Sequence, residues 1–573
     1  MIWQLAPKIP TDSTSAELTY HPLILQLLYN RGFKTPVEIR EFFGDDMSLE
    51  ETGKKYDPFL FRDMNAAVDL VISHIKAGNK IMIYGDYDAD GVTATVVLYE
   101  TLKLLRADVS YYLPDRVSEG YGLNTAAVET LIKDNFKLVI TVDTGIRSKV
   151  EADVAIAGGM DVIITDHHML PDDPDDLPQC LIIDPSDATD NYPCRFLAGV
   201  GVAFKLVEAI LTKSKLDEEQ RQIVLDRNLD LVAIGTIADL VRLSGENRLL
   251  VKRGLEVLNS TRRLGLQKLI AISGIIEDAK IDSWNIGFQI GPRLNAASRI
   301  DHANTALKLL ITKDEADAVA IAADLNDKNI ERQNITKEIM AEVEKQIDPK
   351  NIPPIIVGLC SFEYTAWNEG VIGLVAGRIT EKYYRPTLII THTHDGYKSS
   401  GRSIPELDLI GALEDCAEFL DKYGGHPMAC GFSIFSQEKL DKFLVAIKEN
   451  VGMKLEGLEL SPKINIDCEV DASIIDRDLI AKIALLAPYG QSNPQPKFVS
   501  YQVLVNDIMV MGKDGQHIKI RLNGIWALAF GKSEEYSIFK IGDLVDVVYY
   551  LEINEFKGRS EPQMKIVDIK ISQ

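Results

Sequence analysis

The stretch IMIYGDYDADGVTATVVLYE, from Ile81 to Glu100, joins an apolar run to three acidic residues at alternate positions, with a glycine directly after them. The apolar run predicts a short buried β-strand, and the residues from about Val92 onward predict a helix. A strand, a turn and a helix in this order form the first βα unit of an α/β domain. The three acids, Asp86, Asp88 and Asp90, would lie at the carboxyl end of the strand.

A calcium-binding EF-hand loop has the same pattern of alternating acids before a glycine. That loop also needs a bidentate glutamate at its twelfth position, which is Val97 here. The segment KIMIY before the acids predicts a strand, whereas an EF-hand loop follows a helix. These two differences exclude an EF-hand.

Three further apolar runs end in polar residues in the same way. The run in KLVITVDTG ends at Asp143, that in DVIITDHH ends at Asp166, His167 and His168, and that in LIIDP ends at Asp184. The helical stretches NTAAVETLIKD and SKVEADVAIAGG lie between these runs, so strands and helices alternate. This alternation predicts an α/β fold with a mainly parallel sheet that helices cover on both faces.

Open parallel sheets bind ligands at the carboxyl ends of their strands. A single aspartate after a strand is more often a helix N-cap or a turn residue than a ligand. Here several acids and two histidines collect at one edge, with Asp184 as a further candidate, and the helix NLDLVAIGTIADLV has Asp239 near its end. The joint pattern predicts a site for two divalent cations, and carboxylates with imidazole suit Mn²⁺. The Asp-Thr-Gly at Asp143 also resembles the aspartic-protease motif, but that protein class is all-β and needs a second such motif or a dimer.

Length and composition frame these predictions. A chain of 573 residues predicts several domains, and 46% hydrophobic with 26% charged residues is typical of soluble globular proteins. No apolar run is long enough to span a bilayer, the first residues lack the pattern of a secretion signal, and the six cysteines include no C-x-x-C pair. We therefore expect a cytoplasmic protein with reduced cysteines and no membrane association.

The net charge of −23 is unusual for a nucleic-acid-binding protein, because such proteins are often basic. Binding depends on the local field in a groove, however, and divalent cations reverse that field where carboxylates cluster. Residues 497–573 contain as many basic as acidic residues, so the surplus of acid lies elsewhere in the chain. A basic face in this C-terminal part is compatible with the composition.

Four segments, DYDADG, VDTG, DHH and GTIADLV, resemble the four motifs of the DHH phosphoesterase superfamily in their usual order. Within that superfamily, longer segments resemble the RecJ family of bacterial single-strand exonucleases, and the opening HPLILQLLYNRGFKTPVEIREFF is similar to the N-terminus of that family. The resemblance covers nearly the whole chain, and the combination is specific, whereas DHH alone would be weak. The longer segments are LPDRVSEGYGLN (Leu113–Asn124), IGPRLNAASRI (Ile290–Ile300), SSGRS (Ser399–Ser403) and YGGHPMACGFS (Tyr423–Ser433).

The resemblance implies a site with two Mn²⁺ or Mg²⁺ ions. The metal ligands that it implies are Asp88, Asp90, Asp143, His167 and Asp239. Asp86 and His168 would be their near neighbours, with catalytic roles. His168 could contact the phosphate or donate a proton to the leaving group, or it could instead orient a ligand.

The resemblance also implies residues that contact the nucleic acid, with Tyr121 as a stacking candidate. The implied substrate-binding residues are Arg116, Tyr121, Arg293, Arg299, Ser400, Arg402 and His426. Three of them, Ser400, Arg402 and His426, lie in glycine-flanked segments that we predict to be small turns suited to binding a phosphate. We interpret His392 and His394, in THTHDG, as turn residues rather than metal ligands.

The chain divides into five predicted parts. The polar stretch KDEADAVAIAADLNDKNIERQNITKEIMAEVEKQI predicts a connecting helix, or two helices with a break near Asn326. The strands PPIIVGL, PTLIIT and YKSSGRS surround the helix GVIGLVAGRITEKY and predict a second, smaller α/β lobe. The parts are an N-terminal helical segment (1–60), a DHH catalytic domain (61–312), the connecting helix (313–348), a DHH-associated clamp domain (349–455) and an OB-fold-like nucleic-acid-binding domain (456–573).

Five short segments of alternating polarity after residue 497 predict a small barrel of the OB-fold type. The segments are YQVLVNDIMVMG, HIKIRLNG, IWALAFG, LVDVVYYLEINEF and MKIVDIKIS. Such a barrel binds single strands by stacking bases on aromatic side chains beside cations. Trp526, Phe530, Tyr550, Lys519 and Arg521 are available for this, and we expect at least half of the aromatic residues to fill the barrel core instead.

The resemblance implies a metal-dependent 5′-to-3′ exonuclease that is specific for single-stranded DNA, releases 5′ mononucleotides and acts in DNA repair and recombination. A single-strand-binding protein and a helicase are the implied partners. Two alternatives stay open. A DHH phosphoesterase of short oligonucleotides or cyclic dinucleotides would share the metal motifs but would not need the C-terminal barrel. A non-catalytic replication scaffold would have degraded ligand motifs, whereas all four are intact here.

Overall fold

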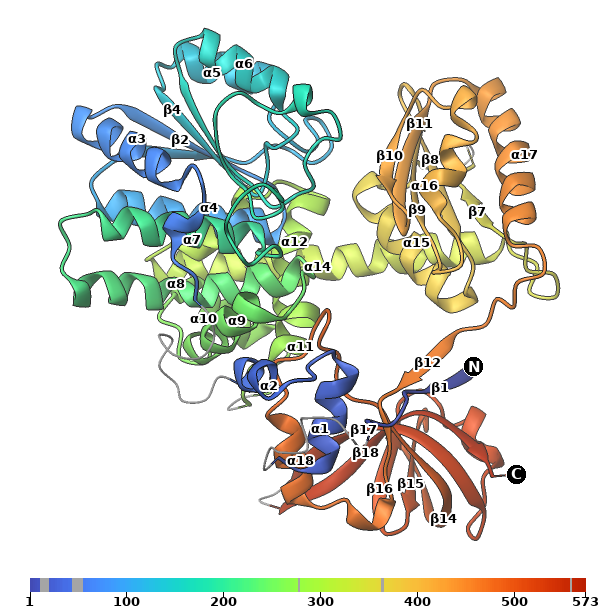
Figure 1. The fold of residues 1–573 in the computed structure, drawn as a ribbon. Coiled ribbons are helices and arrows are strands. Elements are labelled where there is room, and N and C mark those ends of the chain that lie inside the picture. Colours follow the sequence, from blue (N-terminus) through green and yellow to red (C-terminus); the bar gives the residue numbers. More distant parts are fainter. Residues whose placement is uncertain (11–19, 44–54, 277–278, 362–364, 557–558, 573) are drawn as a thin grey trace.

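The computed structural model describes residues 1–10, 20–43, 55–276, 279–361, 365–556 and 559–572. Figure 1 shows two α/β lobes beside each other, the long helix α14 (Glu315–Glu344) running between them, and a β-barrel below. Residues 11–19 and 44–54 of the predicted N-terminal segment lie outside the described residues. The predicted connecting helix is one continuous helix, so the alternative with a break near Asn326 is wrong.

The first lobe is built on a five-stranded sheet in which all neighbouring strands are parallel, in the order β3-β2-β4-β5-β6. This confirms the predicted parallel α/β fold. The edge strand β3 was not predicted, because its alternate residues are exposed and its segment DVSYY lacks a continuous apolar run. The strands are β2 (Lys80–Gly85), β3 (Asp108–Tyr112), β4 (Leu138–Val142), β5 (Asp161–Thr165) and β6 (Leu181–Ile183).

Helices cover both faces of this sheet, as predicted. On one face Ile81 and Ile140 pack against α3, α4 and α7, and on the other face Met82 and Val139 pack against α5 and α6. Successive residues of a strand point to opposite faces, which explains why neighbouring residues belong to different cores. The helices are α3 (Met64–Ala77), α4 (Ala89–Leu104), α5 (Thr125–Lys133), α6 (Lys149–Ala157) and α7 (Gly199–Thr212).

A layer of further helices lies between this sheet and the other parts of the molecule. Helix α8 packs against α4, α7 and α9, and α12 and α13 pack against α14. These helices are α8 (Glu218–Ala238), α9 (Gly245–Leu258), α10 (Leu264–Ile272), α11 (Ser283–Asn285), a π-helix (Ile286–Ile290), α12 (Gly291–Ile300) and α13 (Asn304–Ile311).

The second lobe has a mixed five-stranded sheet in the order β10-β11-β9-β8-β7, with only β7 and β8 parallel. The segment YKSSGRS forms strand β9 as far as Arg402, as the strand prediction expects. The small turns predicted at Ser400, Arg402 and His426 are wrong, because GGH also lies in a strand, β10, where Gly424 pairs with Gly431 in a regular antiparallel hairpin. The elements are β7 (Ile356–Leu359), α15 (Glu369–Tyr383), β8 (Thr387–Thr393), β9 (Gly396–Arg402), α16 (Leu409–Glu414), β10 (Lys422–His426), β11 (Ala429–Ile434) and α17 (Gln437–Lys454).

The C-terminal barrel has the predicted five strands, in the order β14-β15-β16-β18-β17, and a β14–β17 pairing closes it. Its core contains Phe498, Tyr549 and Phe539. Trp526, Phe530 and Tyr550 all keep exposed surface, so the expectation that half of these aromatics fill the core is wrong. The elements are β13 (Cys468–Glu469), α18 (Arg477–Ala484), β14 (Phe498–Met511), β15 (His517–Leu522), β16 (Ile525–Ala529), β17 (Leu544–Phe556) and β18 (Arg559–Ile571).

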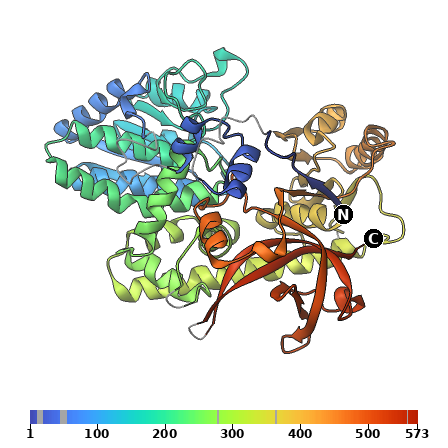
Figure 2. The same ribbon diagram turned by 60° about the horizontal axis from the view of Figure 1, so that its bottom comes forward.

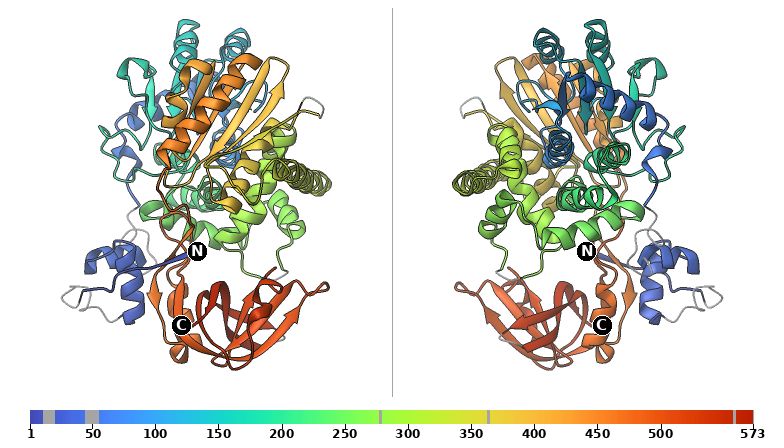
Figure 3. Two further views of the ribbon diagram at one scale, coloured as in Figure 1. Left: turned by 90° about the vertical axis from the view of Figure 1, so that its right-hand side faces the viewer. Right: turned by 90° about the vertical axis from the view of Figure 1, so that its left-hand side faces the viewer.

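The apolar residues of the N-terminal helices α1 (Pro22–Asn30) and α2 (Pro36–Phe43) pack on this barrel, and Figures 2 and 3 show these helices beside it. The segment is not wholly helical, because β1 (Ile2–Leu5) pairs in parallel with β12 (Lys463–Ile466). The two ends of the chain therefore form one structural unit.

Among the described residues, no helix has both the length and the apolar character that crossing a membrane requires.

Candidate metal centre

The acidic loop after β2 is held by hydrogen bonds at the start of α4. Asp88 is the N-cap of this helix, and its Oδ1 accepts hydrogen bonds from the backbone N–H groups of Asp90 (2.8 Å) and Gly91 (3.1 Å). The Ala89 N–H donates to Oδ1 of Asn295 on α12, at 2.7 Å. Asp88 therefore caps the helix, as an aspartate after a strand often does, but it uses only Oδ1 for this. Its Oδ2 is not used in the cap.

Asp90 belongs to the first turn of α4, and its carboxylate reaches the start of α7, where two backbone N–H groups hold it. Gly199 N donates to Oδ2 at 2.7 Å and Val200 N donates to Oδ1 at 2.9 Å. A Cβ on Gly199 would lie 2.4 Å from the Asp143 Cβ, and a Cβ on Gly235 would lie 2.6 Å from the Asp90 Oδ1. The two glycines thus allow α7 and α8 to approach the acidic residues closely.

Three more side chains arrive from the ends of β4, β5 and α8. His167 Nε2 lies 3.0 Å from Asp143 Oδ1 and 3.6 Å from Asp239 Oδ2. Asp143 has a φ of +62°, in the left-handed region that costs energy for a residue with a Cβ. This backbone turns the carboxylate toward His167 directly after the strand ends.

The predicted ligands form overlapping donor sets. Within each of three groups, one ligand atom per residue lies within 4.8 Å of the others; the groups are Asp86–Asp88–Asp143, Asp90–His167–Asp239 and Asp143–His167–His168. All five predicted ligands, Asp88, Asp90, Asp143, His167 and Asp239, belong to this cluster, together with both predicted catalytic residues. The first two groups share no residue, which is the arrangement that two neighbouring cations need.

The donor atoms lie close together, and two of them, Asp143 Oδ1 and His167 Nε2, are 3.0 Å apart. Asp86 Oδ1, Asp143 Oδ1 and His167 Nε2 are buried and make no hydrogen bond within the described part of the chain. A buried polar atom without a partner is costly. Oxygen and imidazole donors left open in this way fit divalent cations of the Mn²⁺ or Mg²⁺ type.

The electrostatics of the centre agree with this fit. Burial, followed by repulsion from neighbouring aspartates, raises the pKa of Asp86 to about 8, of Asp90 to about 7 and of Asp239 to about 9, and raises that of Asp143 well above its usual range. Burial lowers the pKa of His167 to about 4, so its imidazole is neutral and able to bind a cation. Cation binding would ionise the acids and release their protons.

His168 differs from His167 in its protonation. Burial alone would lower its pKa, but the hydrogen bond with Asp166, whose Oδ1 lies 2.7 Å from Nδ1, raises that pKa to about 9. Asp166 also accepts hydrogen bonds from the backbone N–H groups of Ile146 and His167, at 2.9 and 2.7 Å. His168 is therefore a fixed cation beside the aspartates. The Tyr121 hydroxyl lies 2.9 Å from the same Nδ1, so this residue contacts the centre through its hydroxyl group.

The predicted arginines come from both lobes. Arg116 lies over the Tyr87 ring at 4.0 Å, Arg299 donates to the Gly370 carbonyl at 2.7 Å, and Arg402 donates to Ser400 Oγ at 3.3 Å. Arg293 lies farther along α12 and donates to Asn326 Oδ1 of α14 at 3.1 Å. Among the described residues, none of these four arginines forms an ion pair with a carboxylate, so their charges remain available to an anion.

The structure places the remaining candidates differently. His426 is exposed on the edge strand β10 and, through Ala429 of β11, is aligned with Arg402. Asp184 belongs to none of the three donor groups, and its Oδ1 accepts from the Ser186 N–H at 2.7 Å. Neither His392 nor His394 belongs to a donor group, although His392 lies in β8 and not in a turn.

Two positioning residues were missed at the sequence level. Asp166 was seen only as the end of a strand, and Asn295 only as part of a motif, because neither position shows by itself which distant group it contacts. Asp166 orients His168, and Asn295 holds the acidic loop through Ala89. The density of polar residues at the strand ends was the one available signal for Asp166.

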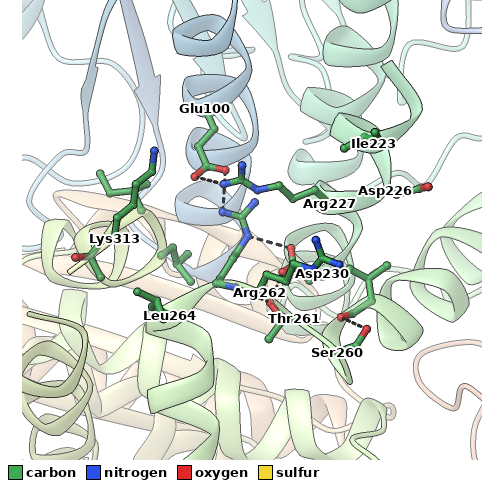
Figure 4. A pocket seen from close by; sticks show the side chains of 15 residues that line it. Glu100, Ile223, Asp226, Arg227, Asp230, Ser260, Thr261, Arg262, Leu264 and Lys313 are labelled. Carbon is green, nitrogen blue, oxygen red and sulfur yellow. Dashed lines mark hydrogen bonds and ion pairs between the residues drawn. The ribbon is translucent and has the colours of Figure 1, made fainter. Parts of the chain in front are cut away.

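A network of ion pairs joins α4, which begins at the acidic loop, to α8, which ends directly before Asp239. Arg263 pairs with Glu100 of α4 at 2.8 Å and with Asp230 of α8 at 3.2 Å, and Arg227 pairs with Glu100 at 2.9 Å. Glu100, Arg227 and Asp230 line a cavity of about 610 Å³. Figure 4 shows these three side chains in the cavity wall. This cavity contains none of the predicted ligands, and the network acts as a brace between α4 and α8.

Comparison with known proteins identifies the family. The models of the DHH family, N-terminal domain, the DHHA1 domain and the RecJ OB domain match residues 80–236, 354–453 and 466–568. The single-stranded-DNA-specific exonuclease RecJ of Bacillus subtilis is 36% identical over 568 residues, which are 98% of this chain and 69% of that protein. The chain belongs to the RecJ family. The RecJ of Salmonella typhimurium is 32% identical over 575 residues, or 96% of each chain.

Solved structures of RecJ proteins agree. The crystal structure of RecJ in complex with Mn²⁺ from Thermus thermophilus matches with a TM-score of 0.82 and 27% identity, over 100% of this chain and 80% of that chain. A structure of an exonuclease RecJ bound to manganese matches with a TM-score of 0.60 and 32% identity, over 70% of this chain and 98% of that one. The expected DHH and RecJ resemblance is confirmed. The matched ranges fall inside the predicted domains 61–312, 349–455 and 456–573, whose outer boundaries stay predictions.

Proposed function

We propose that this RecJ protein is a metal-dependent exonuclease that degrades single-stranded DNA from its 5′ end and releases mononucleotides. The observation that carries the proposal is the pair of donor groups Asp86–Asp88–Asp143 and Asp90–His167–Asp239, which hold buried donor atoms that have no hydrogen-bond partner among the described residues. Relatives named as single-stranded-DNA-specific exonucleases, and RecJ structures with Mn²⁺ and Mg²⁺, support it.

Asp88, Asp90, Asp143, His167 and Asp239 would hold two Mn²⁺ or Mg²⁺ ions. Two such cations supply a water nucleophile near neutral pH and stabilise the charge on the attacking and leaving oxygens of a phosphodiester. Asp86 would complete the donor group that contains Asp88 and Asp143. The protein must bring the phosphate to this place and neutralise the charge that the aspartates leave uncompensated.

His168 suits a proton-donating or phosphate-binding role. With a pKa of about 9 its ring is protonated at neutral pH, and Asp166 fixes its orientation through Nδ1. Nε2 of the same ring then carries the second proton, which can be donated to a phosphate oxygen or to the departing 3′ oxygen.

Arginines from both lobes would hold the phosphate groups. Arg116 and Arg299 come from the first lobe, Ser400 and Arg402 from the second, and Arg299 already joins the lobes through the Gly370 carbonyl. A guanidinium group binds phosphate oxygens with two parallel hydrogen bonds. His426 and Arg293 would contact the strand farther along, and Tyr121 would lie against the terminal nucleotide.

The barrel would hold the strand beyond the two lobes. Lys519 and Arg521 lie 4.7 and 5.8 Å from the centre of the partly exposed Trp526 ring, and Phe530 is 57% exposed. Aromatic rings beside cations stack the bases of single strands. We also propose a cytoplasmic location, with a single-strand-binding protein and a helicase as partners, as expected for a bacterial exonuclease of this family.

The first test uses 5′-labelled and 3′-labelled single strands, a blunt duplex, Mn²⁺ or EDTA, and the variant Asp143→Ala. We expect immediate release of labelled mononucleotide from the 5′ label, stepwise shortening of the 3′-labelled strand and no cleavage of the duplex. EDTA removes the cations and Asp143→Ala removes one of their ligands. Each should reduce the rate by at least about a hundredfold.

The same assay separates the alternatives. Cleavage of oligonucleotides of only a few residues would favour the small-substrate phosphoesterase, and binding without cleavage would favour the scaffold. Deleting residues 497–573 would uncover the apolar faces of α1 and α2, so Trp526→Ala is the sharper probe of the barrel. It should weaken binding of long strands and leave cleavage of short ones unchanged.

A further inference from the structure

The junction between the two lobes contains more arginine than the proposed contacts use. Besides the four arginines described above, Arg332 of α14 and Arg378 of α15 lie there. Helices α12, α14 and α15 pack against one another at this junction. In the part of the chain that the structure describes, Arg332 and Arg378 also form no ion pair with a carboxylate. A protein with a net charge of −23 thus leaves six arginines unpaired in one region.

Arg332 is partly shielded from solvent, and no hydrogen bond from its Nε within the described residues offsets the cost of that burial. It is half-buried, and its Nε is buried with no hydrogen-bond partner among the described residues. Asn329, one helical turn earlier on the same face, is 1% exposed, and its Oδ1 likewise makes no hydrogen bond. This face of the connecting helix therefore carries two polar side chains whose hydrogen-bonding capacity the protein does not meet.

The charges near Arg332 are of its own sign. Burial lowers its pKa, and Arg378 and Arg293 lower it further by repulsion. Three cations held together in this way destabilise the folded protein, and a bound anion would remove the cost. The three side chains come from three helices, so an anion between them would also link the first lobe, the connecting helix and the second lobe.

This arginine group is distinct from the one at the metal centre. Burial raises the pKa of Asp86 and the nearby Arg116 lowers it, whereas burial lowers the pKa of Arg299 and the nearby Asp88 raises it. The charged groups that act on Arg332 are arginines, and no aspartate of the metal centre is among them. Arg299 lies between the two groups, because Arg116, Arg402 and Arg332 all act on it.

We propose that Arg332 and Arg378 form a second phosphate subsite, which binds an internal backbone phosphate of the single strand away from the bond that is cleaved. This inference rests on the proposed function. Guanidinium groups with open N–H donors match the oxygens of a phosphodiester. The connecting helix is then part of the substrate path and not a spacer.

The test measures binding of an oligothymidylate with a 5′-hydroxyl end, in EDTA, at several salt concentrations. Without a terminal phosphate and without hydrolysis, the assay reports internal phosphates alone. Arg332→Gln should weaken binding roughly tenfold and make the dependence of log K on log salt shallower by about 0.7, the value for one contact with a single strand. Arg378→Gln should act in the same direction.

Lys337→Gln is the matched control, because it removes the same charge from the exposed face of the same helix. It should leave the salt slope unchanged. A second readout is the melting temperature, which should stay constant or rise in Arg332→Gln because repulsion is relieved. A purely structural arginine would lower it instead.

The inference is overturned if Arg332→Gln binds the 5′-hydroxyl strand with the salt slope of the unaltered protein. It is also overturned if the difference occurs only with a 5′-phosphorylated strand, since the subsite would then hold the terminal phosphate. Failure of the proposed function is a separate result: the unaltered protein with Mn²⁺ would not cleave the strand, whatever the binding slopes in EDTA.

Discussion

The five aspartates of the metal centre lie close enough to repel one another inside the protein. Burial and this repulsion raise the pKa of Asp86, Asp90 and Asp239 to about 8, 7 and 9, whereas an aspartate in an unfolded chain titrates near 4. The folded metal-free protein therefore holds protons that the unfolded chain has released. Its stability from these groups is complete below about pH 4 and is lost as the pH rises through 7 to 9.

We therefore expect the melting temperature in EDTA to fall between about pH 5 and about pH 9, and the gain on adding Mn²⁺ to be larger at the higher pH. Differential scanning fluorimetry across this range measures both. Asp239→Asn should flatten the fall in EDTA, whereas Asp108→Asn, at an exposed position, should not. A melting temperature in EDTA that rises with pH would contradict this electrostatic account.

Helices α4 and α8 position metal-centre residues at one end and are braced farther along. Asp88 and Asp90 lie at the start of α4, and Asp239 directly follows α8. Arg263, 6% exposed, joins the two helices through Glu100 and Asp230. The sequence of each helix predicts that the helix forms. The ion pairs of Arg263 with Asp230 and Glu100 decide how the two helices are oriented against each other.

Arg263→Met should lower the free energy of unfolding of the first lobe by about 3–5 kcal/mol, because it leaves the buried carboxylate of Asp230 without its cation, whereas Glu100 keeps Arg227. Chemical denaturation followed by circular dichroism measures this change. Arg262→Met, at the exposed neighbouring position, is the control and should change little. Equal stability of the two variants would show that the brace does not matter.

At the scale of the whole molecule, one arginine joins the barrel unit to the first lobe. Arg248 of α9 donates hydrogen bonds to the carbonyls of Leu485, Leu486, Ala487 and Pro488, at 2.8 to 3.3 Å, and its guanidinium lies 4.0 Å from the centre of the Phe42 ring. Burial lowers its pKa to about 10, so it stays charged at neutral pH. No other side chain has the donors to satisfy this set of carbonyls.

Arg248→Met should loosen the barrel and the N-terminal helices from the first lobe while each part stays folded. Limited proteolysis should then cut near residues 485–495 faster, and long strands should bind less tightly with short-strand cleavage retained. Lys252→Met, an exposed change on the same helix, provides the comparison. Unchanged proteolysis in Arg248→Met would mean that other contacts hold the junction.

The sequence predicted secondary structure well wherever a segment shows a single clear pattern of apolar residues. The buried strands β2, β4 and β5 read as continuous apolar runs, and the barrel strands as alternating ones, so both folds and the strand-end acids could be predicted. The strand β3 and the GGH segment could not, because an edge strand with exposed or glycine-rich residues has no such signal.

The sequence by itself determined the α/β and OB-type folds and the family, and it singled out the aspartates and histidines that we propose for the metal centre, because these depend on residue types and on spacings within single segments. Only the tertiary structure decided that α1 and α2 pack on the barrel, that Asp166 holds His168, and that Arg332 and Arg378 lie near Arg293 without a carboxylate partner among the described residues. These features depend on contacts between residues far apart in the chain, where burial and charge change the behaviour of a side chain without any mark in its neighbours.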